Sequence, residues 1–114
     1  MVPPNEEFCL KWDDFQQNIS TSFRELLRTN DFSDVTLVGE DGQEIKTHRV
    51  ILSASSTFFH NILLSNKHSH LMIYMRGMKQ KYLQAILDFI YQGEANVYQD
   101  DLDDFFLVAE EFQL

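Results

Sequence analysis

Cysteine is almost absent from this chain, since Cys9 is the only one in the sequence. A single thiol cannot form a disulfide within the chain, which is typical of proteins from a reducing compartment such as the cytosol or nucleus. Glycine is also scarce, and the four glycines are scattered at expected turns. The sequence therefore contains no glycine-rich loop of the kind that binds phosphate groups.

Long apolar runs and excess positive charge are missing too. No run approaches the roughly 18 residues that a membrane span needs. The first residues, Met1 to Glu7, are polar, contain two prolines and have no apolar core of a signal peptide. The formal net charge is −9, and an acidic chain repels phosphate backbones. We therefore expect no membrane contact and no direct binding of nucleic acid by this segment.

Apolar residues make up 44% of the chain and aromatic residues 13%, mostly phenylalanine. This composition is sufficient for a packed core and argues against disorder. A length of 114 residues suits one domain and leaves little room for a second. We expect a flexible lead-in over residues 1–7 and one domain over residues 8–114.

The central segment from Phe32 to Phe59 has the clearest pattern. Val35 and Leu37 alternate with other residues in the run from Asp34 to Val38, which predicts a strand. Gly39 to Gly42 has turn chemistry, and a second strand is expected at about Gln43 to Lys46. The two strands should form a hairpin.

After the hairpin the apolar residues repeat at helical spacing, which predicts two short helices within Arg49–Leu64. Ser55 or Ser56 is the expected N-cap of the second one. The other expected elements are a one-sided helix over Asp14–Arg28, a strand over Leu71–Met75, a helix over Lys79–Tyr91, a short edge strand over Ala95–Val97 and a helix over Asp101–Phe112. Asp13 or Asp14 should cap the first of these helices and Asp100 or Asp101 the last, while Gly93 should end the helix before it. No stop signal precedes Leu114, so we expect either a cut made just after the domain or a fragment of a longer protein.

The N-terminal stretch has two interpretations. Phe8, Leu10 and Trp12 would share one face of a short strand. From the physics of the chain alone, a strand in the chain's own sheet is favoured, because most strands pair within their chain. The alternative is a strand that pairs with the sheet of a partner.

Candidate chemical groups are few. His48 lies near Ser53, Ser55 and Ser56, and Asp34 could be imagined as a third triad member, but no nucleophile-elbow pattern surrounds any serine. His68 and His70, with only the remote Cys9, do not make a four-ligand zinc set. We therefore predict no enzyme activity, no cofactor and no metal site.

Asp34 and Arg49 also have two interpretations. In the first, Asp34 is an acidic residue at the start of a strand and Arg49 is an exposed basic residue on a helix. In the second, the two side chains form a partly buried ion pair. In a buried pair, loss of one partner leaves an uncompensated charge and costs about 3–5 kcal/mol.

Taken together, residues 8–114 resemble a BTB (POZ) domain of the tramtrack type, which is found in arthropod transcription regulators. The residues that carry the resemblance are the run Phe8 to Phe15, the central residues Asp34, Val35, Leu37, His48, Arg49, Leu52, Ser56 and Phe59, the run Tyr91 to Glu94 with Val97, and Ala109–Glu110. Three positions depart from the usual pattern, namely the loop Lys67–His70 without a proline, the turn Arg76–Met78 and Ala95. These departures leave the loop geometry and any peptide groove open.

The resemblance implies an α+β fold, in which a small sheet is covered by a cluster of helices. It also implies a dimer in which the N-terminal strand is exchanged between protomers and the first helix packs against its twin. The residues expected in the dimer interface are Phe8, Leu10, Trp12, Phe15, Ile19 and Phe23. Asp34 and Arg49 match the charged pair that lies in the dimer cleft of BTB zinc-finger proteins.

The function implied is that of a protein–protein interaction module of a nuclear transcription factor or chromatin regulator. Its expected partners are itself as an obligate homodimer, other tramtrack-type BTB domains, and transcriptional co-regulators, with higher oligomers built on the dimer. One alternative is a substrate adaptor of a cullin-RING ubiquitin ligase. Another is a short chain that consists only of this domain and dimerises with longer relatives.

Overall fold

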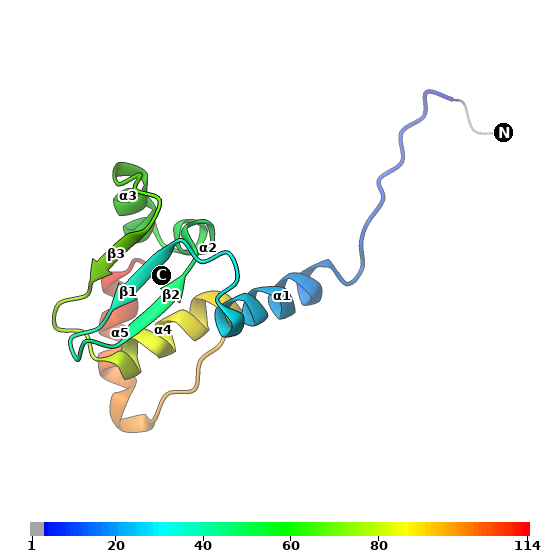
Figure 1. Cartoon of the computed structure of the whole chain (residues 1–114). Helices are drawn as coiled ribbons and strands as arrows, with labels where there is room; N and C mark the ends of the chain where they lie inside the picture. The colour runs from blue at the N-terminus through cyan, green and yellow to red at the C-terminus, as the bar shows by residue number, and fades with distance from the viewer. Residues whose placement is uncertain (1–3) are drawn as a thin grey trace.

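The structure is a computed structural model that describes residues 4–114, so the first three residues of the expected lead-in lie outside the described residues. An N-terminal arm, which we define as residues 4–14, precedes the helices and strands (Figure 1). In chain order these are α1 (Phe15–Thr29), β1 (Val35–Val38), β2 (Glu44–Thr47), α2 (Arg49–Ser55), α3 (Thr57–Ser65), β3 (Leu71–Tyr74), α4 (Gln80–Gln92), the 3₁₀ turn η1 (Gln99–Asp101) and α5 (Leu102–Glu111). The expected α+β fold is confirmed.

The sheet has the strand order β2-β1-β3. β1 and β2 are antiparallel, with Val38 opposite Glu44, and β1 and β3 are parallel, with Val38 opposite Tyr74. The hairpin closes where the Gly39 N–H donates to the Gln43 carbonyl at 3.0 Å. Gly42 has a φ of +82°, a conformation that glycine adopts without a steric penalty. The predicted hairpin is confirmed, although its second strand begins one residue later than expected.

The core lies between the sheet and the helices. In β1, Val35 and Leu37 are buried while Thr36 and Val38 are only half-buried, as expected for a strand with one face toward the core. The core consists of Val35, Leu37, Ile45, Ile51, Leu52, Phe59, Leu63, Met75, Met78, Leu83, Ile86, Leu87, Tyr91, Phe105 and Phe112. Burial of these side chains, at about 25 cal/mol per Å² of apolar surface, is the main stabilising term of the fold.

Ser56 separates α2 from α3. Its backbone is extended, with φ −134° and ψ 123°, so the helical region Arg49–Leu64 is two helices. The Ser56 hydroxyl accepts a hydrogen bond from the Phe59 N–H at 3.2 Å and donates one to the carbonyl of Phe112 at 2.6 Å. Of the two predicted N-caps, Ser56 is therefore the correct one, and it also ties α3 to the end of α5.

The ends of the other helices are partly as expected. Gly93 ends α4 in the left-handed conformation, with φ +81°. Asp14 and Asp101 occupy the N-cap positions of α1 and α5, but neither side chain makes a capping hydrogen bond. The Asp101 carboxylate instead accepts from the ammonium of Lys81 and the hydroxyl of Tyr82, because both lie within reach on the neighbouring α4.

Two stretches expected as strands have no partner strand in the single chain, so the interpretation of Phe8–Trp12 as a strand of the chain's own sheet is wrong, while its exchange with a partner stays a prediction. Ala95–Val97 has no strand geometry, and Phe8–Trp12 is not part of the chain's own sheet. Neither stretch has a backbone hydrogen-bond partner within residues 4–114 that would complete a ladder. An extended segment becomes a strand only when another backbone pairs with it, so apolar alternation alone was not sufficient.

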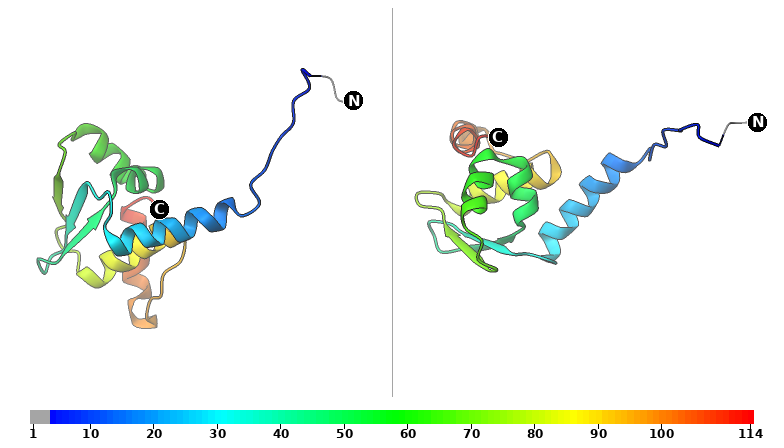
Figure 2. Two further views of the ribbon diagram at one scale, coloured as in Figure 1. Left: turned by 45° about the vertical axis from the view of Figure 1, so that its right-hand side comes forward. Right: turned by 90° about the horizontal axis from the view of Figure 1, so that it is seen from above.

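α1 and the arm extend away from the rest of the molecule (Figure 2). α1 contacts α4, and the half-buried Phe23, Leu26 and Leu27 pack against the core from its C-terminal half. No residue of α1 is fully buried. The helix is thus anchored at one end, while its first turns and the arm have little contact with the domain.

Candidate functional site

The N-terminal arm exposes three large apolar side chains on a segment that extends from the domain. Phe8, Leu10 and Trp12 are 64%, 91% and 59% exposed, and Phe15, the first residue of α1, is 50% exposed. The rings of Trp12 and Phe15 contact each other, with centroids 5.5 Å apart. Large apolar side chains grouped in this way indicate an interaction surface.

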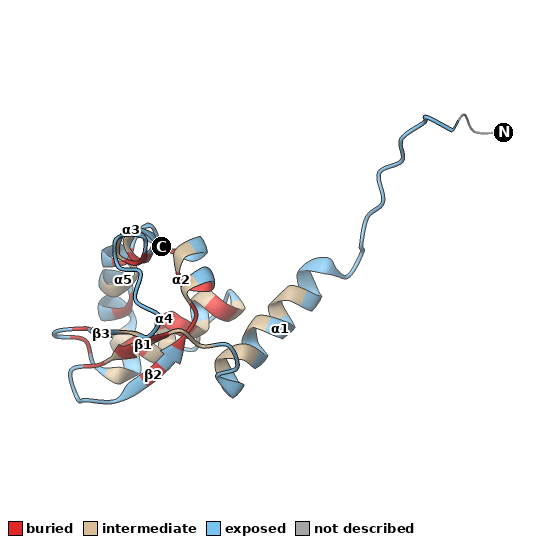
Figure 3. Cartoon of the chain, turned by 45° about the horizontal axis from the view of Figure 1, so that its top comes forward, coloured by how far each residue is buried: buried red, intermediate tan, exposed pale blue. Residues whose placement is uncertain are grey.

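The predicted interface residues on α1 divide into two groups. Ile19 is half-buried, and Phe23 is half-buried and packs against the core. The arm residues and Phe15 have no such support, and most of the arm and the first turns of α1 are exposed (Figure 3). The structure therefore brings Phe23 to the domain and leaves the surface from Phe8 to Phe15 uncovered.

Asp34 and Arg49 do lie next to each other, but not as an ion pair. The Asp34 carboxylate accepts a hydrogen bond from the backbone N–H of Arg49 at 2.8 Å. It therefore satisfies an N–H in the first turn of α2, where a negative charge is favoured by the helix dipole. The ion pairs of residues 4–114 are Glu25–Arg28 and Lys81–Asp101, so of the two interpretations the ion pair of Asp34 with Arg49 is not formed in the single chain. The position of these two residues near a dimer cleft stays a prediction.

The guanidinium of Arg49 is used elsewhere. It donates to the carbonyls of Leu63 at 3.3 Å and Asn66 at 2.8 Å, and also to the carbonyl of His68. Leu63 is in the last turn of α3, where carbonyls lack helical partners and a cation is favoured. Arg49 thus joins the start of α2 to the end of α3 and to the loop before β3.

Sequence reasoning missed a buried polar cluster around His48. The ring Nε2 lies 2.6 Å from the carbonyl of Asp31, and Nδ1 lies 2.7 Å from the hydroxyl of Tyr91. A carbonyl can only accept, so Nε2 carries a proton, and in the neutral form of the ring Nδ1 accepts from the Tyr91 hydroxyl. The Tyr91 oxygen in turn accepts the His48 backbone N–H at 3.0 Å, and burial raises the pKa of Tyr91 far above its usual value.

This cluster fixes the connection between α1 and β1. Asn30 and Phe32 in that connection have φ values of +64° and +61°, which are uncommon for residues with a Cβ. The hydrogen bond from His48 to Asp31, which lies between them, holds the turn in place. His48 and Tyr91 are far apart in the sequence, so no local signal could have identified the pair.

These hydrogen bonds also bear on the idea that Asp34, His48 and a serine form a catalytic triad. Both ring nitrogens of His48 are engaged, by Tyr91 and by Asp31, and the Ser56 hydroxyl is bonded to Phe112. No serine hydroxyl is bonded to His48 within residues 4–114. In the same part of the chain, no group of three or more His, Cys, Asp or Glu residues could hold a metal ion, and no helix is long and apolar enough to cross a membrane.

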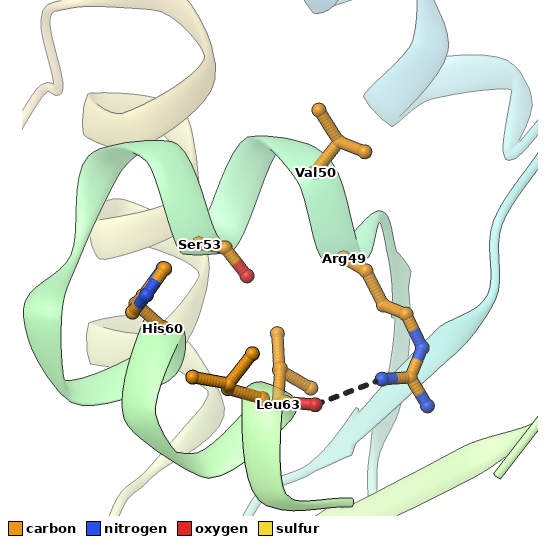
Figure 4. A pocket seen from close by; sticks show the side chains of 6 residues that line it. Arg49, Val50, Ser53, His60 and Leu63 are labelled. Atoms are coloured by element: carbon orange, nitrogen blue, oxygen red, sulfur yellow. Dashed lines mark hydrogen bonds between the residues drawn. The ribbon is translucent and has the colours of Figure 1, made fainter. Parts of the chain in front are cut away.

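A shallow pocket of about 240 Å³ lies between α2 and α3 (Figure 4). Figure 4 shows Ser53 on α2 directed toward His60 and Leu63 on α3, with Arg49 and Val50 at the start of α2. The pocket is open and mainly apolar. Its shape and chemistry suit an apolar side chain of a protein partner better than a small polar substrate.

Comparison with known sequences gives a consistent result. A family model described as "BTB/POZ domain" matches residues 23–114. In Drosophila melanogaster, "Longitudinals lacking protein-like" is 42% identical over the whole chain, which covers 89% of that protein. Protein bric-a-brac 2 and the alpha isoform of Protein tramtrack, from the same organism, are 39% and 36% identical over the whole chain. The chain spans only 11% and 14% of their respective lengths.

Two solved structures are similar to this fold. The BTB domain of human gigaxonin has a TM-score of 0.81 at 23% identity, over 96% of this chain and 89% of that one. The BTB domain of zebrafish PATZ1 has a TM-score of 0.81 at 18% identity, over 94% of this chain and 87% of that one.

Proposed function

The chain belongs to the BTB/POZ family of protein-interaction domains, and from this membership we propose that it is the self-association module of a transcription or chromatin regulator. In this proposal two copies form an obligate dimer through the N-terminal arm and α1. The domain itself would occupy residues 8–114, after a flexible lead-in. Such a regulator would act in the nucleus.

The observation that carries the proposal is the uncovered apolar surface of the arm. Phe8, Leu10 and Trp12 are all more than half exposed on a segment that projects from the domain. Burial of one such side chain contributes about 1.5–3 kcal/mol. A second copy offers the same surface in return, because a two-fold interface brings identical patches together.

A groove on the domain could receive the arm of the partner. The stretch Ala95–Val97 is neither helix nor strand and lacks a backbone partner among the described residues. It borders an apolar groove of about 370 Å³ that is also lined by Phe89, Leu102, Phe105 and Phe106. An arm that paired with Ala95–Val97 would form the two missing strands at once and would bury its apolar face in the groove.

α1 would then pack against its twin. Phe15 and Ile19 extend the apolar surface of the arm along the helix, where no other element of the chain covers them fully. In the same proposal Asp34 and Arg49 lie near the resulting cleft. The two side chains do not pair with each other, and each binds a backbone group instead. They would therefore affect the binding of a co-regulator by holding that backbone in place.

Light scattering of the intact chain and of a version lacking residues 1–12 tests the proposal. The intact chain should be a dimer or a larger oligomer at micromolar concentration, and the shortened version should be less stable or less associated. A monomeric intact chain would contradict the dimer. If both versions associate equally, the arm is not exchanged between protomers. The dimer would then be held together by the contact between the two α1 helices.

One comparison favours a second candidate function. The chain covers 89% of "Longitudinals lacking protein-like", so that relative consists of little besides the matched domain. A protein of this kind would act by forming mixed dimers with longer relatives. Co-expression with the matching segment of Protein tramtrack, followed by affinity purification through a tag on one chain, should recover a mixed dimer.

The adaptor alternative makes a different prediction. A cullin-RING adaptor should co-purify with a cullin from cell extract, whereas a self-association module should recover copies of itself and related domains. A stoichiometric cullin in the purified complex would therefore replace the proposal made above.

A further inference from the structure

The charges of this chain are segregated along the sequence. Between Ile45 and Leu87 there is no aspartate or glutamate, so all 18 acidic residues lie outside this segment. The segment contains all four histidines and six of the nine Lys and Arg residues, namely Lys46, Arg49, Lys67, Arg76, Lys79 and Lys81. An otherwise acidic protein thus has a basic middle third, which includes α2, α3 and β3.

β3 lies in this basic segment and forms a free edge of the sheet (Figure 1). The Met75 N–H donates to the Val38 carbonyl at 2.8 Å, so the backbone of Met75 points toward β1. In a parallel pair the direction alternates along the strand, so Ile73 and Leu71 also point toward β1. The backbone N–H and C=O groups of Met72 and Tyr74 therefore point away from the sheet.

This edge lacks the features that usually prevent a strand from pairing with another chain. Its residues, Leu71–Tyr74, include no charge, proline or glycine. Met72 and Tyr74 are 60% and 59% exposed on the solvent face of the sheet. The opposite edge strand, β2, differs because its exposed residues are the charged Glu44 and Lys46.

Cationic side chains lie at both ends of the β3 edge, and the nearest carboxylates belong to Asp34, beside the start of β3, and to Glu44, which lies in one row with Val38 and Tyr74. Lys67, His68 and His70 precede the strand, and Arg76 follows it. On the solvent face, Lys46 lies in one row with Thr36 and Met72, since both pair with Thr36 in the sheet. Lys46, Lys67 and Arg76 are exposed, and their side chains have no ion pair among residues 4–114.

We propose that the β3 edge is a second docking site, which takes an extended segment of a partner protein with apolar residues in its middle and carboxylates at both ends. The segment would add to the sheet as a strand next to β3, through the backbone groups of Met72 and Tyr74. Its apolar side chains would cover Met72 and Tyr74, and its carboxylates would lie near Lys67 and Arg76. The site is separate from the arm and from the groove at Ala95–Val97, so it does not depend on the proposed dimer.

A peptide suits this edge better than a nucleic acid does. Unpaired strand backbone and uncharged side chains complement another strand, whereas phosphates need a dense row of cations. Here the cations lie at the two ends of an uncharged strand. The whole chain also has a net charge of −9, which repels nucleic acid at longer range.

The test uses the intact chain and a fluorescent peptide, Glu-Glu-Val-Thr-Val-Thr-Val-Glu-Glu. Fluorescence polarisation should detect binding, while a peptide with lysine in place of each glutamate should not bind. Hydrogen exchange of the Met72 and Tyr74 amides should slow when the acidic peptide is present. Light scattering of the same samples reports the oligomeric state, so failure of this site is distinguishable from failure of the dimer.

Two charge-reversed double variants locate the site. Lys67→Glu with Arg76→Glu should weaken binding of the acidic peptide about tenfold, as expected for the loss of two surface charge contacts. Lys79→Glu with Lys81→Glu makes the same change in net charge away from the edge and should have a much smaller effect. Lys67 and Arg76 are exposed and make no ion pair within residues 4–114, so both should be replaceable without unfolding.

Three results would overturn the proposal. Equal weakening by the two double variants would mean that the peptide senses only the overall charge. Peptide binding that appears only after removal of residues 1–12 would mean that the arm of another copy occupies the β3 edge in the intact chain. The arm is also flanked by acidic residues, namely Glu6, Glu7, Asp13 and Asp14. Tighter binding of a single-stranded oligonucleotide than of the peptide would assign the basic segment to nucleic acid.

Discussion

At the scale of single residues, Arg49 matters through the backbone groups that its guanidinium binds. It donates to three carbonyls, at Leu63, Asn66 and His68. Arg49→Gln should lower the free energy of unfolding by about 1–3 kcal/mol, because the partly buried Leu63 carbonyl and two exposed carbonyls lose a charged donor. Asp34→Asn should cost less, since an amide oxygen can still accept the Arg49 N–H.

Urea denaturation of both variants beside Lys81→Gln checks this prediction. Lys81 pairs with Asp101 on the surface, so its loss should change stability little. Hydrogen exchange should also be faster in the loop from Asn66 to His68 in Arg49→Gln. Equal stability of all three variants would contradict the role of Arg49.

Tyr91 supplies a second residue-scale prediction. Its hydroxyl accepts the His48 backbone N–H and donates to the His48 ring. Tyr91→Phe leaves both groups of His48 buried without this partner, which should lower the free energy of unfolding by about 1–3 kcal/mol. Thermal melts at neutral pH measure the loss, and a variant as stable as the natural chain would rule out the cluster.

The pH dependence of stability should also change in Tyr91→Phe. Burial raises the pKa of Tyr91 in the folded state, so the unfolded chain releases this proton first as pH rises. The contribution of Tyr91 is fully present below the usual tyrosine pKa of about 10 and is lost above it. A hydrogen bond to Asp104 raises the pKa of Tyr82, and a hydrogen bond to Asp101 raises the pKa of Lys81. Both groups therefore also lower stability as pH rises, but they do so equally in the natural chain and in Tyr91→Phe. The stability difference between the two proteins should therefore shrink above pH 10, and a constant difference would contradict this account.

At the scale of elements, Ser56 determines where α2 ends and α3 begins. Its hydroxyl caps α3 at the Phe59 N–H and also bonds to the carbonyl of Phe112. Ser56→Ala should reduce stability by about 1–2 kcal/mol through loss of the cap, with a further loss from the unpaired Phe112 carbonyl. Ser55→Ala is the matched control, because Ser55 is exposed at the end of α2. Chemical denaturation should separate the two variants, and equal losses would refute the capping role.

The extended segments behave differently from the helices at this scale. A helix satisfies its backbone within its own residues, so Lys79–Tyr91 and Asp101–Phe112 were found at nearly the expected bounds. A strand depends on a neighbour, and Phe8–Trp12 and Ala95–Val97 have none within the described residues. Both segments would become strands only if another backbone paired with them.

At the scale of the whole molecule, association should depend on the arm and not on exposed apolar residues in general. Leu10→Asp should weaken the dimer, because a carboxylate would have to be buried in an apolar interface. Leu107→Asp is the matched control, since Leu107 is 64% exposed on α5, away from the arm and outside the groove. Sedimentation equilibrium measures both, and equal dimer affinity of the two variants would exclude the arm from the interface.

Dimer formation should also make thermal stability depend on concentration. If folding and association are coupled, the melting temperature of the intact chain should rise with protein concentration. In Leu10→Asp this dependence should weaken. A melting temperature that is constant over a hundredfold range of concentration would indicate that the folded monomer is stable by itself.

The sequence by itself determined the elements whose signals are local. Apolar spacing located the hairpin and the helices, Gly93 marked the end of α4, and the pair Ser55–Ser56 marked the start of α3. The family was also readable from the sequence, because its motif residues occur at characteristic spacings, and the family model matches residues 23–114. These features depend on residues close together in the chain, where backbone geometry fixes the distances.

Only the tertiary structure decided which polar groups meet. His48 and Tyr91 are separated by 43 positions, and Arg49 bonds to carbonyls 14 to 19 positions away. The opposite charges of Asp34 and Arg49 suggested an ion pair, but the fold places the carboxylate at the N–H of Arg49 and the guanidinium at the end of α3. Carbonyls occur at every position and leave no mark in the sequence, so only packing determines which of them an arginine reaches.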